Sequence, residues 1–232
     1  MKISGSVALV TGANRGLGKQ FVASLLDRGA TKVYATARRP ELITIPGVIA
    51  LRLDITDPTS IAAAAAAAPD VNLLINNAGI ATGQSLITGD LAEIRREMDT
   101  HFYGTLNMIR AFAPHLAEGT ILNVLSALSW FSLNGSNAYS AAKAAAWSLT
   151  NGVRLELAAQ NTQVTALHLG AADTDLTARY NGPKIPPLQA VTAALDGIET
   201  GQLEVLADDW SRHVKASLAG DPAAFYASMT AP

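Results

Sequence analysis

Residues Val7–Gly18 of this 232-residue chain read VALVTGANRGLG. Four apolar residues, typical of a buried strand, lead through Thr11 into a turn that carries Gly12 and Gly16, and an apolar pattern of helical spacing follows. Glycines at such a joint let the backbone turn sharply and bring amide N–H groups against a pyrophosphate at the helix N-terminus. The stretch therefore predicts a nucleotide-binding strand–turn–helix unit. A tight turn without a ligand is the alternative interpretation.

Six further β-branched, apolar runs repeat this pattern, each followed by a stretch with helical spacing. They are Lys32–Ala35, Val48–Leu53, Val71–Ile75, Thr120–Val124, Val164–His168 and Leu203–Leu206. Apolar strands that alternate with helices predict a parallel sheet covered on both sides. We expect one doubly wound α/β Rossmann domain over residues 1–232, with seven parallel strands and helices on both faces.

One irregular segment follows the sixth predicted strand. It runs from Gly170 to Leu188 and contains two proline-bearing pairs, Gly-Pro and Pro-Pro. In an open α/β sheet, the loops at the carboxyl ends of the strands form the ligand crevice. We therefore expect a substrate lid over about residues 170–188.

The composition excludes several kinds of chemistry. The chain has no cysteine, and its four histidines show no metal-ligand spacing, so thiolate catalysis and a metal site are not expected. A formal net charge of −2 provides no broad basic field for nucleic acid or anionic lipid. No window offers eighteen strongly apolar residues. We expect a cytoplasmic protein that acts on a small molecule, with no metal, nucleic-acid or membrane partner.

The end of the second predicted strand indicates which dinucleotide binds. An NAD site carries an acid there for the ribose 2′-hydroxyl, whereas an arginine accommodates the 2′-phosphate of NADP. Residues Ala35–Arg39 read ATARR, so Arg38 stands at this point and no acid does. Arg15 in the glycine turn could face the same phosphate, and NADP(H) is the expected cofactor; two solvated arginines are the alternative. Asp54 could accept from the adenine amino group or simply cap a strand end.

A hydroxyl, a phenol and an ammonium follow the fifth predicted strand at ordered spacings. A helix from Asn137 to about residue 158 would place Tyr139 and Lys143 on one face. A phenol with a pKa near ~10 is a poor proton source at neutral pH, and we expect Lys143 to lower that pKa. Ser126 would give a second hydrogen bond to the same substrate oxygen. Beside a nicotinamide, this arrangement suits carbonyl reduction or its reverse.

In this order, the motifs resemble those of the short-chain dehydrogenase/reductase family, of the NADP-dependent carbonyl reductase type. The matching parts are Thr11–Gly18 with its three glycines, Asn76–Gly79 (NNAG), Ser126, and Tyr139 four residues before Lys143. The resemblance implies that Tyr139 protonates the substrate oxygen and Ser126 orients it. It also implies that Lys143 holds the nicotinamide ribose while lowering the tyrosine pKa.

The resemblance extends to the cofactor and to two departures from the family pattern. It implies that Thr174 holds the nicotinamide carboxamide. His101 stands where the family usually has an asparagine that fixes a water in a proton relay behind the lysine. An imidazole could hold this water, could block the relay, or could be satisfied by nearby backbone. Leu169 precedes Gly170 where proline is usual, which would loosen the entry to the lid.

The expected site residues fall into three groups. The catalytic group is Ser126, Tyr139, Lys143 and His101. The cofactor-binding group is Gly12, Asn14, Arg15, Gly16, Leu17, Gly18, Arg38, Asp54, Ile55, Asn77, Ala78, Gly79, Tyr139, Lys143, Gly170 and Thr174. The substrate group is Ser126, Trp130, Leu133, Tyr139, Leu176 and Tyr180. The aromatic and aliphatic residues of the last group would make an apolar pocket.

These residues define the functional hypotheses. The first is an NADPH-dependent carbonyl reductase or alcohol dehydrogenase that acts on a hydrophobic ketone or aldehyde, with Tyr139 as general acid or base. The alternative is an NADP(H)-binding redox sensor with little turnover because His101 disrupts the relay. A third is an isomerase or dehydratase that uses bound NADP. The retained Ser126, Tyr139 and Lys143 favour the enzyme. Small and apolar residues on two sides of the tyrosine helix predict a homodimer or homotetramer.

Overall fold

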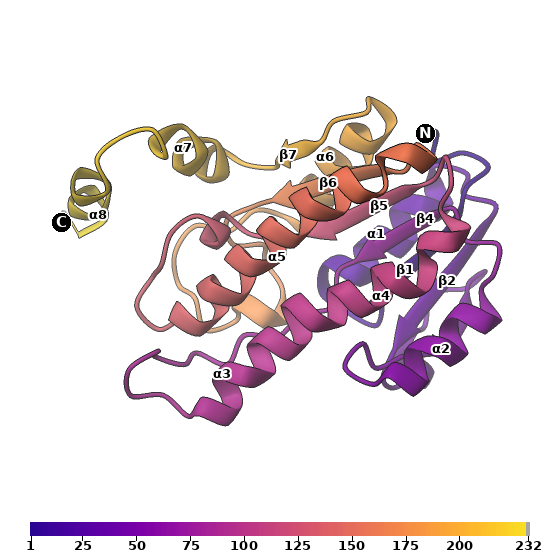
Figure 1. The fold of residues 1–232 in the computed structure, drawn as a ribbon, viewed down its shortest axis with the longest axis horizontal. Coiled ribbons are helices and arrows are strands. Elements are labelled where there is room, and N and C mark those ends of the chain that lie inside the picture. Colours follow the sequence, from indigo (N-terminus) through magenta and orange to yellow (C-terminus); the bar gives the residue numbers. More distant parts are fainter. Residues whose placement is uncertain (231–232) are drawn as a thin grey trace.

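The computed structural model describes residues 1–230 and places seven strands in one parallel sheet, in the order β3-β2-β1-β4-β5-β6-β7 (Figure 1). The strands are β1 (Val7–Thr11), β2 (Lys32–Ala37), β3 (Ile49–Arg52), β4 (Leu73–Asn76), β5 (Thr120–Val124), β6 (Gln163–His168) and β7 (Glu204–Leu206). The predicted fold class, a doubly wound Rossmann-type α/β fold, is confirmed.

Eight α-helices are found in the part of the chain that the structure describes. They are α1 (Gly16–Asp27), α2 (Pro58–Ala67), α3 (Leu91–Met98), α4 (Thr105–Phe112), α5 (Asn137–Glu156), α6 (Pro187–Glu199), α7 (Asp209–Ser217) and α8 (Pro222–Thr230). A π-helical turn, η2 (Asp99–Gly104), joins α3 to α4. Within residues 1–230, no helix combines the length and the apolar character needed to cross a membrane.

The two faces of the sheet carry separate cores because side chains alternate along each strand. On β1, Ala8 and Val10 pack into the core that α1 and α6 cover. Leu9 points to the other face, into a core that includes Met108 and Phe112 of α4. These five side chains are fully buried, as expected for a central strand of a parallel sheet.

The edge strand β3 departs from the sequence prediction. Its run was expected to be apolar and covered on both faces, but β3 pairs only with β2 and most of its residues are exposed. Ile49, for example, is 42% exposed. An edge strand has one neighbour and lies beyond the helices that cover the sheet centre, so apolar composition alone does not bury it.

Local capping sets where several helices begin. The Asp57 carboxylate accepts a hydrogen bond from the backbone N–H of Thr59, and Pro58 occupies the first turn of α2 without needing a donor. Asp90 caps α3 in the same way by accepting from the N–H of Ala92 at 2.8 Å. α3 leads into η2, which contains His101, so this cap contributes to the position of the site.

The strand order reverses between β1 and β4, and this reversal opens a crevice above the carboxyl ends of the strands. Thr11, at the end of β1, spans the reversal. Its hydroxyl accepts hydrogen bonds from the backbone N–H groups of Asn77 and Ala78, both at 2.9 Å. In return, the Asn77 side chain donates to the Thr11 carbonyl at 2.8 Å. The turn after β1 and the turn after β4 are therefore held as one unit.

A buried polar network fixes α5 against the sheet. The Asn76 side chain donates to Asn123 at 2.8 Å, and Asn123 donates to the hydroxyl of Thr150 at 2.9 Å. Thr150 donates in turn to the carbonyl of Ala146 in its own helix. Because a buried polar group that loses its partner costs about 1–3 kcal/mol, this chain of bonds favours one position of α5 relative to β4 and β5.

The first turn of α1 passes directly over the turn that follows β1. A Cβ added to Gly18 would lie 2.2 Å from the carbonyl oxygen of Gly12 and 2.6 Å from Nδ2 of Asn77. Neither neighbour is free to move, since one is backbone and the other is bound to Thr11. Gly18 therefore permits the close approach of helix and strand that the turn requires.

Gly18→Ala is expected to lower the free energy of unfolding by about 1–3 kcal/mol, because the added methyl group forces the backbone apart. Gly152→Ala is the matched control: Gly152 lies inside α5, and nothing lies within 4 Å of an added Cβ. That control should gain up to about 1 kcal/mol from helix propensity. Calorimetric unfolding of both variants measures the difference. A Tm for Gly18→Ala equal to that of the wild type would contradict the packing described for this turn.

Candidate active site

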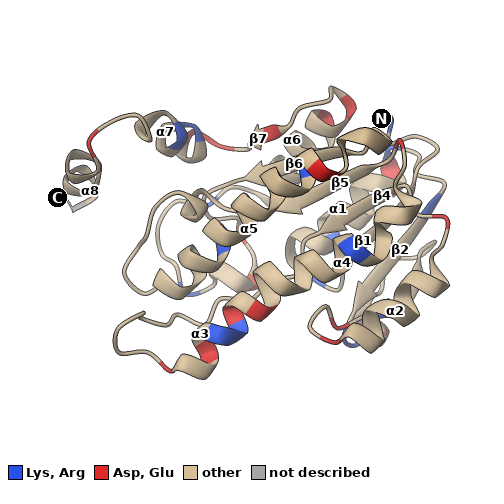
Figure 2. Ribbon diagram, viewed as in Figure 1, with Lys and Arg blue, Asp and Glu red and all other residues tan. Residues whose placement is uncertain are grey.

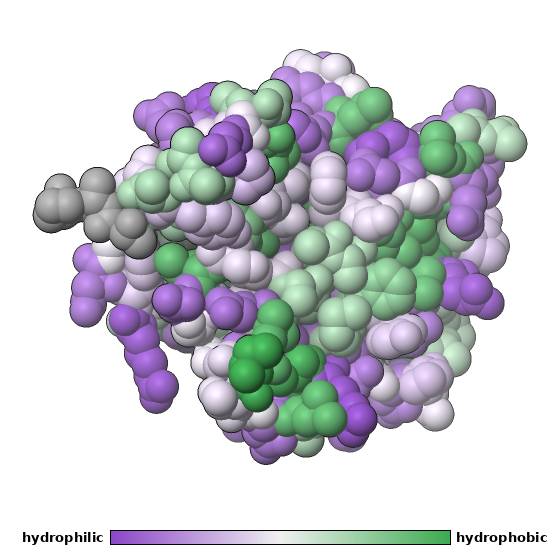
Figure 3. Space-filling model, turned by 60° about the vertical axis from the view of Figure 1, so that its left-hand side comes forward, coloured by the Kyte–Doolittle hydropathy of each residue, from purple (hydrophilic) through white to green (hydrophobic). Residues whose placement is uncertain are grey.

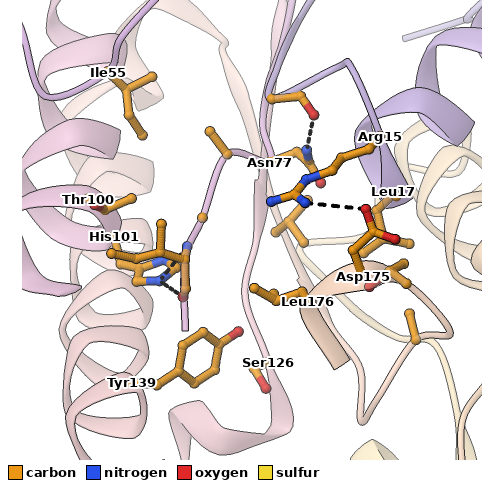
Figure 4. Close-up of a pocket in the computed structure, with 18 of the residues that line it drawn as sticks. Arg15, Leu17, Ile55, Asn77, Thr100, His101, Ser126, Tyr139, Asp175 and Leu176 are labelled. Carbon is orange, nitrogen blue, oxygen red and sulfur yellow. Dashed lines mark hydrogen bonds and ion pairs between the residues drawn. The ribbon is translucent and has the colours of Figure 1, made fainter. Parts of the chain in front are cut away.

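A cavity of about 440 Å³ lies over the reversal in strand order. Its walls come from the turns after β1, β2, β3, β4, β5 and β6, from α3 and η2, from the start of α5 and from the short helix η6 (Asp175–Thr177). The residues expected from the sequence that line it are Gly12, Asn14, Arg15, Gly16, Leu17, Arg38, Asp54, Ile55, Asn77, Ala78, Gly79, His101, Ser126, Tyr139, Lys143, Gly170, Thr174 and Leu176. Segments far apart in the chain thus meet at one place (Figure 4).

The hydroxyl, phenol and ammonium groups converge from two elements. Ser126 directly follows β5, and its hydroxyl accepts from the N–H of Leu128 at 3.1 Å. Tyr139 and Lys143 stand one turn apart near the start of α5. Both side chains line the cavity, and the Tyr139 hydroxyl lies on the side of its ring that faces Ser126 (Figure 4). A substrate oxygen in this cavity could therefore accept hydrogen bonds from two hydroxyl groups, those of Ser126 and Tyr139.

Lys143 is buried below the cavity. Its Nζ donates to the carbonyl of Val124 at 2.8 Å and lies 5.5 Å from the centre of the Tyr139 ring. Burial lowers the pKa of Lys143 to about 8, and the negative charge of Glu97 opposes this effect. The ammonium therefore remains mostly protonated at neutral pH.

The expectation that Lys143 lowers the pKa of Tyr139 is wrong for this structure. Burial raises the pKa of the Tyr139 phenol, the Glu97 carboxylate raises it further, and the Ser126 hydroxyl lowers it. Desolvation penalises the phenolate more than the neighbouring hydroxyl stabilises it. Tyr139 is consequently protonated at neutral pH, which is the state that a proton donor needs.

His101 lies in the π-helical turn η2 and is 2% exposed. Its Nε2 lies 2.8 Å from the carbonyl oxygen of Ile80, and its ring meets the Tyr139 ring edge-on, with 5.1 Å between the centroids. Burial lowers the pKa of His101, and the charge of Lys143 lowers it further, so the imidazole is neutral at pH 7. His101 was expected to hold the relay water, to block the relay or to be satisfied by nearby backbone. The backbone contact applies to Nε2 and leaves Nδ1 available for another partner.

The adenosine end of the cavity has the donors and acceptors that a phosphorylated dinucleotide needs. Arg38, an exposed residue just beyond β2, faces the cavity with no carboxylate beside it on that strand end. One oxygen of Asp54 accepts from the backbone and side chain of Thr56, and the other has no hydrogen-bond donor among residues 1–230. Burial alone would raise the pKa of Asp54, but these bonds and the charge of Arg38 lower it, so the group is an ionised acceptor.

Arg15 reaches from the glycine turn to the segment expected to form the lid. It pairs with Asp175 at 3.2 Å, and both side chains are largely exposed (Figure 4). A solvated pair of this kind contributes less than about 1 kcal/mol. A phosphate group, with more negative charge than a carboxylate, would compete effectively for Arg15.

Three residues expected to face the substrate do not line the cavity. Trp130 stacks on His168, with 3.9 Å between the ring centroids, and lies beneath the ammonium of Lys215 at 4.8 Å. Leu133 and Tyr180 are partly exposed and also lie outside the lining. Trp130 belongs to a separate small core with residues of α7 and α8, and the substrate role of these three residues stays a prediction.

Gly18 also lies outside the cavity lining, because it packs under the turn rather than facing the cavity. Several other residues were missed by sequence reasoning. Thr11 braces the glycine turn, Asn123 anchors α5, and Glu97 is buried beside His101 with no exposed surface. Asn123 leaves a trace in the sequence, since it is a lone amide inside an apolar strand. Glu97 leaves another, since it stands four residues before His101 on the same helical segment.

Comparison with known proteins finds the same family that the motifs resemble. Residues 6–184 match the family described as short chain dehydrogenase. An NADPH-dependent 1-acyldihydroxyacetone phosphate reductase of Schizosaccharomyces pombe is 33% identical over 184 residues, which cover 75% of this chain and 62% of that protein. A 3-oxoacyl-(acyl-carrier-protein) reductase of Vibrio cholerae is 31% identical over 217 residues, which cover 88% of this chain and 86% of that protein.

The overall structure agrees with these sequence matches. A short chain dehydrogenase from Burkholderia cenocepacia, determined in complex with NADP, is 41% identical and superposes with a TM-score of 0.95 over 100% of both chains. The parallel sheet, the glycine turn and the Ser126, Tyr139 and Lys143 constellation occur here together, and the match extends over most of the chain. The chain therefore belongs to the short-chain dehydrogenase/reductase family.

Proposed function

We propose that this protein is an NADPH-dependent carbonyl reductase, or an alcohol dehydrogenase in the reverse direction, that uses Tyr139 as its general acid. One observation carries the proposal: Ser126 and Tyr139 line the same cavity as the glycine turn. A protein that only bound a dinucleotide would have no use for a matched pair of donors at that point.

The residues present fit NADP(H). Gly16 has a positive φ of 54°, which favours glycine, and it lines the cavity at the start of α1, where backbone N–H groups can bind a pyrophosphate. Arg38 and Arg15 would hold the 2′-phosphate, Asp54 the adenine amino group, and Lys143 and Thr174 the nicotinamide half. When bound, the cofactor supplies the hydride. The NADP complex of the Burkholderia cenocepacia protein supports this choice.

The protein groups supply the proton and the orientation. Tyr139, protonated at neutral pH, donates to the carbonyl oxygen as negative charge develops on it. Ser126 donates a second hydrogen bond to that oxygen, because its backbone position is fixed at the end of β5. Lys143, one turn beyond Tyr139, lines the same cavity with its Nζ 5.5 Å from the centre of the phenol ring.

Several apolar side chains line the cavity. Its lining includes Ile80, Val124, Leu125, Leu169 and Leu176, with Arg96 as the nearby basic side chain. Such walls favour a ketone or aldehyde with hydrophobic substituents. The two curated relatives are named as reductases of acyl-bearing substrates, which agrees with this preference.

Self-association remains a prediction of the proposed function. Figure 3 shows apolar side chains gathered in patches on one face of the molecule. On α5, Leu155 is 79% exposed, and Tyr103 of η2 is 53% exposed. A homodimer or homotetramer would bury such side chains. Light scattering of the purified chain measures the oligomeric state directly.

A redox sensor is the second candidate, and one observation favours it. His101 stands in place of the asparagine whose side-chain amide usually holds the family's relay water. Its Nε2 atom contacts the carbonyl oxygen of Ile80 instead. A sensor would bind NADPH and turn over no carbonyl compound. A third possibility, an isomerase or dehydratase that uses bound NADP, has no supporting feature in the cavity.

Tyr139→Phe is expected to reduce carbonyl reduction by about 10²–10⁴-fold, because it removes the proton donor. NADPH affinity should change little, since the ring and its packing remain. Tyr103→Phe, an exposed tyrosine outside the cavity, is the matched control and should retain activity. NADPH oxidation, followed by absorbance over a panel of aldehydes and ketones, gives the rates. Persistent reduction by Tyr139→Phe would exclude the assigned role.

Arg38→Asp is expected to shift cofactor preference from NADPH toward NADH. A carboxylate at this position repels the 2′-phosphate and accepts a hydrogen bond from a 2′-hydroxyl. Arg39→Asp makes the same charge change one residue further on, at an exposed position outside the cavity. Cofactor titrations compare the Kd values of the two dinucleotides. A ratio that changes equally in both variants would mean that Arg38 acts only through the net charge.

A further inference from the structure

Glu97 is a buried carboxylate that the proposed reaction has not yet used. It lies in the last turn of α3, has no exposed surface, and precedes His101 by four residues. α3 carries charges of both signs (Figure 2), and its two arginines, Arg95 and Arg96, are exposed. Burial of an ionised carboxylate costs desolvation free energy unless charged or hydrogen-bonding groups surround it. The groups around Glu97 therefore indicate what this carboxylate does.

The two oxygens of Glu97 have different surroundings. Oε1 accepts a hydrogen bond from the backbone N–H of Thr82 at 2.6 Å. Oε2 is fully buried, lies 3.3 Å from Nε2 of His101, and has no well-aligned donor among residues 1–230. Burial alone would raise the pKa of Glu97, but the contacts with His101 and Thr82 lower it. The group is therefore an ionised carboxylate that faces a histidine ring nitrogen.

The neighbours of His101 determine which ring nitrogen carries the proton. Nε2 faces two acceptors, the carbonyl oxygen of Ile80 at 2.8 Å and Oε2 of Glu97 at 3.3 Å. The backbone N–H of Ile80 is the one donor nearby, and it lies farther away at 3.4 Å. A nitrogen that faces two acceptors at closer range carries the hydrogen. In a neutral imidazole this leaves Nδ1 as an acceptor, and Nδ1 has no partner among the described residues.

We propose that Glu97 is a positioning residue of this site: it fixes the Nε2–H tautomer of His101 and supplies a buried negative charge to the Lys143 ammonium. The inference rests on the proposed function and extends it to a residue outside the cavity lining. His101 lines the cavity and contacts the ring of Tyr139, so a bare Nδ1 there can accept a hydrogen bond from a water or from an ammonium. Glu97 and His101 together take the place of the asparagine side-chain amide that the family usually has at position 101.

The charge of Glu97 has a defined effect on its neighbours. Burial lowers the pKa of Lys143 to about 8, and Glu97 opposes that shift. The charged or titratable groups around Lys143 include Glu97 from α3, His101 from η2, Tyr139 from α5 itself and His168 from β6. Glu97 thus provides the negative charge in this set. Without the carboxylate, the pKa of Lys143 would fall further, and the ammonium would be lost at a lower pH.

Glu97→Gln tests the proposal with little change of volume. Because the Thr82 N–H requires an oxygen, the new amide would direct its NH₂ group toward Nε2 of His101. A donor at that point favours the opposite tautomer. Nitrogen-15 NMR of the imidazole in the full-length chain, with and without NADPH, distinguishes the two. We expect Nε2–H in the wild type and a shift toward Nδ1–H in Glu97→Gln. Wild-type protonation at Nδ1, or an unchanged tautomer in the variant, would overturn the proposal.

The pH dependence of kcat provides the second readout. In Glu97→Gln, the alkaline limb of carbonyl reduction should move down by about one pH unit, with little change in the KM for NADPH. Glu93→Gln is the matched control, because Glu93 lies one turn earlier on α3, pairs with Arg96 and does not line the cavity. An alkaline limb that stays in place in Glu97→Gln would contradict the electrostatic role. If the wild type reduces no carbonyl compound, the proposed function fails, while the NMR experiment still decides the role of Glu97.

Discussion

The hydroxyl of Thr11 joins the two halves of this molecule. It accepts two backbone N–H groups from the turn after β4 while lying at the end of β1, where the strand order reverses. The first turn of α1 then packs on this joint so closely that Gly18 has no room for a side chain. Every wall of the cavity is placed relative to that joint, because the sheet is parallel and its carboxyl ends lie at one edge.

The second constraint is the burial of charge beside the cavity. Lys143, His101 and Glu97 are almost completely removed from solvent; Glu97 raises the pKa of Lys143, and both charges act on the pKa of His101. Burial favours neutral forms, whereas the Glu97 carboxylate retains the positive charge on Lys143. A protonated phenol, a charged ammonium and a neutral imidazole follow from this balance. Proton donation to a substrate oxygen needs this combination of states.

Much of the fold follows from local patterns in the sequence. Apolar runs separated by helical stretches identify all seven strands, since parallel strands are buried on both faces. The glycine turn and the spacing of Tyr139 and Lys143 indicate the site, because both depend on backbone geometry within a few residues. The exposed edge strand β3 could not be recognised in this way, since exposure depends on which strand has a neighbour.

The differences between expectation and structure at the site have a similar origin. Trp130 follows β5, where pocket residues are expected. In the folded chain it packs instead against apolar residues of α7 and α8, which come much later in the sequence. The pKa of Tyr139 was expected to fall because Lys143 is near in sequence, yet the degree of burial decides its direction. Glu97 was missed because only the folded chain brings its carboxylate to His101 and Thr82. Long-range packing determines each of these outcomes.

The central claim is that the cavity transfers a hydride from NADPH to a carbonyl carbon. The most direct measurement uses NADPH deuterated at the nicotinamide C4 position, a panel of hydrophobic ketones and aldehydes, and mass spectrometry of the products. The account predicts one deuterium on the new carbinol carbon, with transfer from one face of the nicotinamide only. Tight binding of NADPH with no deuterated product from any member of the panel would contradict the account and favour a sensor.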